Sequence, residues 1–482
     1  MSATILYVGA TATLSNGAER VGKSLMTRLL KEGYHVHCVK PVTHQHDRYG
    51  EDLGSLGVTV HSVPYGWWTD GDESRSDVEI EAVHAIVEII RISHASLVIS
   101  NTLNVPWGAF AAAVSNVPHI WLAHEYPNEG EFSYLSRRLA MINALSSCLM
   151  TASEGLRDVM ATQYGIEAIS FRPPVDIPAI SDSAIHDQRL VCVSGGYSDR
   201  KNQLELLKAL AIIKGRDPAF STQTLLIGGD ARGLYSETLR TFISQHGLSD
   251  LVTFVDFTED PWLLVRSTDV AVFPSKQEVF PIAVCEAILA GLPVIASDIR
   301  GHTEVADLSG GLVTGRIKLY RCGDASDLAD NMVKTLDTNM PTNVMDASDN
   351  LRECVLQETA LGPVVAAVES VLEKEGVIGS WSIPPYILTV TDTAQSRWQL
   401  LVGITQRLGI EAPTDQPDAV RVDAIISRIR ELESHIQDQE REITELGKAY
   451  NSMLISRRWR TVTAVLSPLD WVRRSLFSRR SG

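Results

Sequence analysis

The sequence has 482 residues, of which 44% are hydrophobic and 21% charged, proportions typical of a globular protein with two or three buried cores. Its net charge of −16 argues against a nucleic-acid partner, because nucleic-acid binding requires a basic surface. Six scattered cysteines without C-x-x-C spacing exclude a zinc ribbon and a disulfide framework, and indicate a reducing compartment.

Short apolar, β-rich runs alternate with helical patterns over residues 1–375, which is typical of parallel sheets flanked by helices. The Pro-rich stretch 171–188 interrupts this alternation, because proline disfavours both helix interiors and central strands. We therefore predict an α/β fold with two doubly wound domains, at 1–175 and 186–375. The predicted strands are 4–9, 34–39, 58–63, 96–100, 119–123 and 147–152 in the first domain, and 189–195, 223–229, 252–257, 270–275 and 293–298 in the second.

The pattern changes after residue 375. A connector at 376–419 leads to a heptad-like run at 420–455, in which apolar residues recur at alternating steps of three and four. This spacing predicts a coiled coil that joins copies of the chain or recruits a partner, with Gln439 at one seam position. A single amphipathic helix packed on the globular body stays open as an alternative.

Residues 456–482 carry seven arginines and one aspartate, a net charge of +6 in an otherwise acidic chain. Tryptophan, leucine, valine and phenylalanine lie between the arginines, which favours an amphipathic segment on an anionic membrane surface. Nucleic acid and a solvated tail stay open as other interpretations. Without an N-terminal signal pattern or about 18 consecutive apolar residues, the chain is expected to be cytoplasmic and peripheral on the inner face of the plasma membrane.

Residues 17–24 spell G-x-x-x-x-G-K-S, the phosphate-binding loop of NTPases. In such a loop the first glycine closely follows a strand and the lysine opens the helix. Here a long gap precedes Gly17, and the apolar helical stripe starts near Ala18, which places Lys23 in the second turn. The first domain also has no acid-ended strand that could hold magnesium. We therefore reject the NTPase interpretation.

The same loop resembles the first loop of retaining glycosyltransferases of the GT-B fold, family 4 or group 1. That family reads G-G-A-E-R before a helix that ends in G-H-x-V, and this sequence has N-G-A-E-R at 16–20 and G-Y-H-V at 33–36. The resemblance implies two Rossmann-like domains that face each other across a cleft, 1–175 for the acceptor and 186–375 for the nucleotide-sugar donor. It also implies that Gly17 and Ala18 approach the donor closely.

Residues 275–305 resemble the E-x7-E motif of the same family, with Glu278 and Glu286 as its two acids. Carboxylates accept two hydrogen bonds each, so by resemblance Glu278 binds sugar hydroxyls and Glu286 binds the ribose. The intervening amides would hold the donor phosphate and sugar. Pro281 stands where the family has glycine and offers no N–H. The residues concerned are Phe280, Pro281, Ile282 and Ala283.

The loop that follows the first strand of the second domain resembles G-R-x-x-x-x-K-G of the family. Lys201 matches the lysine, Asn202 replaces the last glycine, and Gly196 replaces the arginine. A diphosphate leaving group requires positive charge, which Lys201 and the adjacent Arg200 are expected to supply. His124, after the predicted strand 119–123, resembles the family's histidine that faces the transferred sugar.

The resemblance implies a hexosyltransferase that acts with retention of configuration and needs neither metal nor cofactor, with a nucleoside-diphosphate sugar as donor. The acceptor is expected to be a glycan or a lipid-linked glycan of surface-polysaccharide synthesis, because the tail also resembles the S-x-x-W-R ending of such transferases. Catalytic roles fall to His124, Lys201 and Glu278. Two alternatives stay open: a GT-B sugar-nucleotide epimerase, and a weakly active scaffold, which the departures at Gly196 and Pro281 favour.

Overall fold

The computed structural model describes residues 3–13, 17–43, 46–67, 76–127, 135, 139–181, 188–230, 233–310, 316–337 and 346–373, all within one compact unit. Asn16 lies outside the described residues. So do the predicted connector at 376–419, the predicted coiled coil at 420–455 and the basic tail at 456–482.

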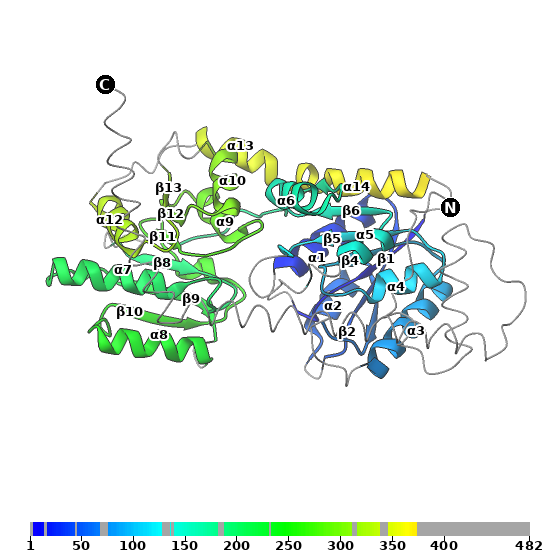
Figure 1. Cartoon of the computed structure of the whole chain (residues 1–482), viewed down its shortest axis with the longest axis horizontal. Helices are drawn as coiled ribbons and strands as arrows, with labels where there is room; N and C mark the ends of the chain where they lie inside the picture. Colours follow the sequence, from blue (N-terminus) through cyan, green and yellow to red (C-terminus); the bar gives the residue numbers. More distant parts are fainter. Residues whose placement is uncertain are drawn as a thin grey trace, which may run out of the picture. The chain divides into compact units, whose positions relative to one another are not determined.

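Two parallel sheets, each covered by helices, form the described part of the chain (Figure 1). The first sheet has the strand order β3-β2-β1-β4-β5-β6-β7. Its strands are β1 (Thr4–Val8), β2 (His35–Pro41), β3 (Thr59–Val63), β4 (Ala95–Asn101), β5 (His119–Ala123), β6 (Cys148–Thr151) and β7 (Ile169–Ser170). Its helices are α1 (Gly17–Lys31), α2 (Arg48–Ser55), α3 (Ser76–Ser93), α4 (Trp107–Val114), α5 (Leu139–Leu145) and α6 (Glu154–Tyr164).

The second sheet has the order β10-β9-β8-β11-β12-β13. Its strands are β8 (Leu190–Val193), β9 (Thr224–Gly229), β10 (Val252–Asp256), β11 (Val270–Phe273), β12 (Val294–Ser297) and β13 (Ile317–Tyr320). The helices that follow are α7 (Gln203–Arg216), α8 (Leu234–Gln245), the 3₁₀ helix η3 (Pro261–Leu264), α9 (Ile282–Leu289), α10 (Arg300–Leu308), α12 (Ala325–Leu336), α13 (Asp346–Val355) and α14 (Gln357–Glu373).

The prediction of two doubly wound α/β domains is confirmed, and each of the eleven predicted strands overlaps an observed one. The strands β7 and β13 were not predicted. β7, with two residues, is too short to show a recognisable pattern. Both add to a sheet edge beside a strand that the sequence did predict.

The strand order reverses beside β8, which lies between β9 and β11. In doubly wound sheets, ligands bind beyond the carboxyl ends of the strands at such a reversal. The loops after β8 and β11 are therefore the expected location of a site in the second domain. Lys201 lies on the first of these loops and Glu278 on the second.

The helix α1 begins at Gly17, as the apolar stripe predicted, and the chain turns at Gly33 with φ of +88°. Lys23 therefore lies in the second turn, where its Nζ pairs with Asp52 at 3.3 Å. This placement removes Lys23 from the helix N-terminus, where a phosphate-binding lysine acts. The rejection of the NTPase interpretation is consistent with this geometry.

The last described helix, α14, packs into the core of the first domain, where Leu361, Val364 and Val368 lie among buried residues of α1 and β4. The segment Asp349–Glu373 is long and apolar enough by composition to cross a membrane, the single such helix among the described residues. Core helices pass the same test, and the packing of α14 accounts for its apolar face.

Candidate active site

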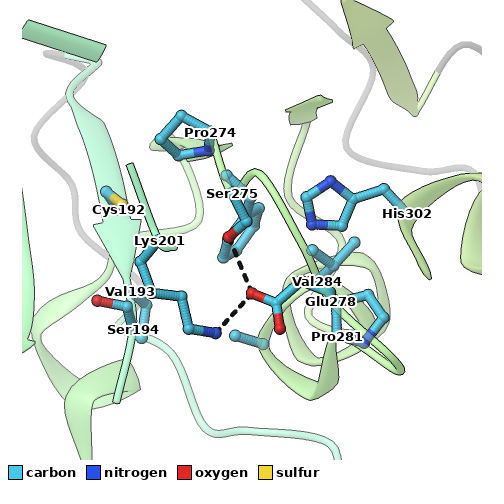
Figure 2. A pocket seen from close by; sticks show the side chains of 12 residues that line it. Cys192, Val193, Ser194, Lys201, Pro274, Ser275, Glu278, Pro281, Val284 and His302 are labelled. Carbon is cyan, nitrogen blue, oxygen red and sulfur yellow. Dashed lines mark hydrogen bonds and ion pairs between the residues drawn. The ribbon is translucent and has the colours of Figure 1, made fainter. Parts of the chain in front are cut away.

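A small pocket, partly open to solvent, lies beyond the carboxyl ends of β8 and β11 (Figure 2). The loop after β8 contributes Lys201, and the loop after β11 contributes Ser275 and Glu278. Ala283 near the start of α9 and His302 on α10 also line the pocket. The pocket thus occupies the reversal of strand order in the second sheet.

Glu278 is surrounded by donors. Its Oε1 lies 2.6 Å from Lys201 Nζ and accepts from Ser275 Oγ at 2.8 Å, and its Oε2 lies 3.3 Å from Arg200 Nη1. Burial alone would raise the pKa of this carboxyl, but the two cations outweigh burial and lower it to about 2. Glu278 is therefore ionised, and the structure brings three predicted site residues together.

The backbone conformation of Asn202 shapes the end of the loop after β8, which carries Lys201. Asn202 caps α7 with φ of +55°, a left-handed conformation that glycine adopts freely and asparagine tolerates better than most residues. This conformation accounts for asparagine at a position where the resembling family has glycine. Gln203 holds the same loop, since its Nε2 donates to the carbonyl of Gly196 at 3.1 Å.

In this loop the second positive charge comes from Arg200, because Gly196 replaces the arginine of the resembling family. A Cβ added at Gly196 would meet no atom within 4 Å among the described residues, so space, rather than a clash, surrounds this position. Arg200 Nη1 reaches the backbone carbonyl of Gln277 at 3.4 Å as well as Glu278. The predicted second cation is therefore positioned at the site.

Glu286 has different neighbours. Trp262 of η3 donates its Nε1 proton to Glu286 Oε2 at 2.9 Å, and Arg20 of α1 donates to Oε1 at 3.3 Å. Burial raises the pKa of Glu286, and Arg20 and Trp262 offset only part of that rise. Beside this pair, a Cβ on Gly17 would lie 3.3 Å from Cδ1 of Ile282, so the glycine lets α1 begin close to α9.

The start of α9 offers fewer free amides than the resemblance implied. Pro281 caps the helix and has no N–H, and the amide of Ile282 donates to the carbonyl of Phe280 at 3.1 Å. The Phe280 side chain is buried in the core of the second domain. Ala283 lies in the first turn of α9 and lines the pocket.

Comparison with known proteins identifies both domains. Residues 15–174 match the family model Glycosyltransferase Family 4, and residues 179–343 match Glycosyl transferases group 1. HepE of Anabaena, solved in complex with UDP and glucose, superposes with a TM-score of 0.60 over 76% of this chain and 99% of its own, at 18% identity. This chain belongs to the GT-B glycosyltransferases of group 1 and family 4.

Two curated relatives of this GT-B chain match over shorter segments. The D-inositol 3-phosphate glycosyltransferase of Jonesia denitrificans is 29% identical over 159 residues, which are 31% of this chain and 38% of the relative. The GDP-mannose:cellobiosyl-diphosphopolyprenol alpha-mannosyltransferase of Xanthomonas oryzae is 32% identical over 139 residues, 28% of this chain and 36% of the relative. The chain thus spans less than half the length of either relative.

His124 follows β5 in this GT-B chain but does not line the pocket that holds Glu278. Its ring packs edge-on against Phe171, with 5.8 Å between ring centroids. Burial lowers the pKa of His124 to about 4, so the ring is neutral near pH 7. Its Nε2 has no hydrogen-bond partner among the described residues. A role toward the sugar stays a prediction.

Glu19 is a buried acid and Glu304 a partly buried one, and the sequence assigned no firm role to either. Glu19 accepts from the amides of Ala10 and Thr11 at 2.6 and 3.1 Å, and so fixes the loop after β1. The backbone carbonyl of Ala18, next to Glu19, accepts from Asn101 Nδ2 at 3.1 Å.

Glu304 accepts from the amides of Glu154 and Gly155 at 3.0 and 3.1 Å. These two amides open α6, so Glu304 supplies the carboxylate that a helix N-terminus favours. The structure therefore gives Glu304 a capping contact with the first domain.

Across the described ranges, no group of three or more His, Cys, Asp or Glu side chains is arranged to hold a metal ion. Whether the reaction needs a metal stays a prediction. His302 and Trp262 were missed by the sequence reasoning, although both contact the two acids of the motif or their pocket. A histidine or tryptophan at such a position carries no signal without the tertiary contact.

Proposed function

We propose that this chain is a retaining hexosyltransferase that moves a sugar from a nucleoside diphosphate to a glycan or lipid-linked glycan. The observation that carries the proposal is the pairing of Lys201 and Arg200 with Glu278 in the pocket at the strand reversal. Two cations beside one carboxylate fit a donor that brings both phosphates and hydroxyls. HepE of Anabaena, whose fold is similar, was solved with UDP and glucose.

Donor binding would exchange partners within this cluster. The diphosphate, with its greater charge, takes over Lys201 and Arg200, and Glu278 then turns its free oxygens to sugar hydroxyls. The side chain of Arg20 is 50% exposed, so the ribose can replace it at Glu286 while Trp262 continues to hold the other oxygen.

The proposed chemistry is a displacement on the face from which the phosphate departs. The bond between the anomeric carbon and the phosphate oxygen breaks, and Lys201 and Arg200 stabilise the charge that develops on that oxygen. The same oxygen receives the proton of the acceptor hydroxyl as the new glycosidic bond forms. Configuration is retained because the acceptor attacks from the face that the phosphate leaves.

Thermal unfolding of the purified full-length protein with UDP-glucose, GDP-mannose, ADP-glucose and dTDP-glucose, with and without EDTA, tests donor binding. One nucleotide class should raise the melting temperature, and EDTA should not remove the effect. Lys201→Ala should abolish the rise. Lys276→Ala is the matched control, because Lys276 lies in the loop after β11 but pairs with exposed Asp199 at 2.6 Å.

Transfer should then be measured with the donor that binds, and NMR should assign the anomeric configuration of the product. An inverted product contradicts the retaining mechanism, whereas donor isomerisation without an acceptor favours the epimerase. If no donor stabilises the protein, the scaffold interpretation replaces the proposal.

We propose a lipid-linked acceptor and a cytoplasmic membrane surface on sequence grounds, from the basic tail at 456–482. The Xanthomonas relative, whose name includes a diphosphopolyprenol substrate, supports this choice of acceptor. Full-length protein should co-sediment with vesicles that contain anionic phosphatidylglycerol but not with neutral ones. Substitution of Arg473 and Arg474 by glutamate should weaken this binding, and equal binding of the variant contradicts the proposal.

We further propose that residues 420–455 join copies of the chain as a coiled coil. Light scattering coupled to size exclusion should give an oligomer for the wild-type protein. Ile429→Asp together with Ile436→Asp should shift it to a monomer without loss of donor binding. A wild-type monomer at micromolar concentration contradicts the coiled coil.

A further inference from the structure

His302 is a fully buried histidine that lines the donor pocket and has no role in the function proposed above. Figure 2 shows its ring facing Glu278 from the start of α10. Gly301 permits this approach, because a Cβ at Gly301 would lie 2.4 Å from the carbonyl oxygen of Glu278. The backbone before His302 is therefore held tightly against the loop that carries Glu278.

The hydrogen bonds of Ser297 fix the position of the ring proton. Ser297 Oγ donates its single proton to the carbonyl of Ser275 at 2.5 Å. The same Oγ lies 3.0 Å from His302 Nδ1, and the carbonyl of Ser297 lies 2.9 Å from it. Both oxygens are acceptors toward the ring, so Nδ1 carries the proton and donates to them.

The other ring nitrogen, Nε2, is then a lone-pair acceptor. Burial lowers the pKa of His302 to about 4, so Nε2 is not protonated near pH 7. No donor reaches Nε2 among the described residues, and its atom is shielded from solvent. Buried acceptors are rarely left without a donor, which points to a donor that arrives with a ligand.

The chemistry of that donor follows from the neighbouring groups. His302 Nε2 and the ionised Glu278 are both acceptors, so they repel phosphate oxygens and attract hydroxyl groups. Lys201, which reaches Glu278 from the side away from His302 in Figure 2, and Arg200, which contacts the other carboxylate oxygen, favour phosphate. The pocket thus has a cationic end and an end whose groups only accept hydrogen bonds.

We propose that Nε2 of His302 accepts a hydrogen bond from a hydroxyl of the transferred sugar and so helps to select that sugar. This inference rests on the proposed donor-binding function. Because the ring is buried in this structure, a pocket side chain must move before the hydroxyl arrives. Lys201 is the side chain that a donor phosphate would draw away from Glu278.

Two variants separate the two ring nitrogens. His302→Asn keeps a donor at the position of Nδ1 and removes the acceptor at Nε2, whereas His302→Gln places an amide oxygen near Nε2. With UDP-glucose or GDP-mannose, whichever the wild type binds, His302→Asn should weaken the affinity about three- to tenfold, the value of one hydrogen bond. The affinity for UDP or GDP alone should not change, and His302→Gln should recover part of the loss.

The wild-type protein provides a test that does not depend on variants that fold. The nitrogen NMR signal of His302 Nε2 should shift when the sugar nucleotide binds but not with the nucleoside diphosphate. Among deoxy-sugar analogues of the donor, the one that lacks the contacted hydroxyl should leave this signal unchanged.

Several outcomes overturn the inference. Equal losses of sugar-nucleotide and nucleoside-diphosphate affinity in His302→Asn assign a structural role, and no loss of either assigns the acceptor to an ordered water. If the Nε2 signal of the wild type does not change when the donor binds, no sugar hydroxyl contacts Nε2, and the inference is wrong. If the wild type binds UDP or GDP but no sugar nucleotide, the inference about His302 is wrong. If it binds none of these compounds, the proposed function itself is wrong.

Discussion

Glu278 and Glu286 are the same residue type in one motif, yet their surroundings are opposite. Glu278 contacts two cations, and its pKa is lowered to about 2. Glu286 contacts an indole N–H and one half-exposed arginine, and burial raises its pKa. The first is an ion within a charge cluster, and the second is a buried hydrogen-bond acceptor.

This difference shows how one helix can separate two parts of a nucleotide sugar. A charged diphosphate competes for the partners of Glu278, whereas neutral ribose hydroxyls need only an acceptor such as Glu286. The motif gives the spacing of the two acids along the chain. The groups that each acid contacts come from the loop after β8, from η3 and from α1.

The largest expected effect comes from neutralising the two acids one at a time. Glu278→Gln should lower kcat/KM for transfer about a hundredfold, because it removes the charge that organises both cations and the sugar. The same variant should bind UDP or GDP at least as tightly as the wild type, since Lys201 and Arg200 lose their competitor. Glu286→Gln should instead weaken nucleotide binding about tenfold.

Isothermal titration with the nucleoside diphosphate and steady-state kinetics with the donor separate these effects. Asp269→Asn is unsuitable as a control because Asp269 is buried and forms an ion pair with Arg189. Asp330 is exposed, so Asp330→Asn serves as the matched acid-to-amide change. Similar losses of nucleotide affinity in Glu278→Gln and Glu286→Gln would remove the proposed difference between the two acids.

The pH dependence of folding sharpens the comparison further. The pKa of Glu278 falls from 4.5 to about 2 on folding, so its ionised form adds stability above pH 4.5 that is lost as the pH falls toward 2. This contribution is on the order of 3 kcal/mol. The pKa of Glu286 is raised, so its contribution is full below its unfolded pKa and is lost as the pH rises.

Urea unfolding of Glu278→Gln and Glu286→Gln between pH 2 and 7 measures both contributions. The free energy of unfolding of Glu278→Gln should depend less on pH than that of the wild type below pH 4.5. The free energy of Glu286→Gln, relative to the wild type, should improve as the pH rises above 4.5. Parallel pH profiles of the wild type and both variants would show that the two acids do not differ.

The sequence predicted the doubly wound fold because each strand and helix has a local pattern of apolar residues. Lys201 and Glu278 were predicted as site residues from their match to two family motifs, and the structure places both beyond strands where the sheet order reverses. The sequence could not predict that Arg20 and Trp262 share Glu286. Arg20 lies 266 residues from Glu286, and contacts at such separation leave no local pattern.

The resemblance to a family had a similar limit. It implied donor amides at 280–283, whereas the structure has the amide of Ile282 bonded to Phe280. It gave no role to His302, whose importance depends on the hydrogen bonds of Ser297. Such roles depend on contacts made by the folded chain and not on spacing in the sequence.

Substitutions at two glycines test how tightly the segments around Glu278 are packed. Gly301→Ala should lower the free energy of unfolding by about 1–3 kcal/mol, because its Cβ would press on the carbonyl of Glu278 at 2.4 Å. Gly196→Arg should change stability by less than about 0.5 kcal/mol, because space surrounds that position. The new cation should also bring nucleotide affinity to the wild-type level or above it.

Chemical denaturation and nucleotide titration of the two variants give the comparison directly. A stable Gly301→Ala with normal transfer would mean that the Glu278 loop is not held by α10. A destabilised Gly196→Arg would mean that the loop after β8 is more tightly packed than its surroundings indicate.

The smallest expected effect concerns the indole on the Glu286 side. Trp262→Phe keeps a buried aromatic ring but removes the N–H that donates to Glu286 Oε2 at 2.9 Å. The pKa of Glu286 should rise further, and nucleotide affinity should fall about threefold, because the carboxylate loses one of its two hydrogen-bond donors. Titration of both proteins with UDP or GDP measures the loss. Because the Glu278 cluster does not contact Trp262 by any hydrogen bond among the described residues, kcat for transfer should stay at the wild-type value. A fall in kcat without a fall in affinity would therefore mean that the two acids are coupled, and that the helix between them does not keep their roles apart.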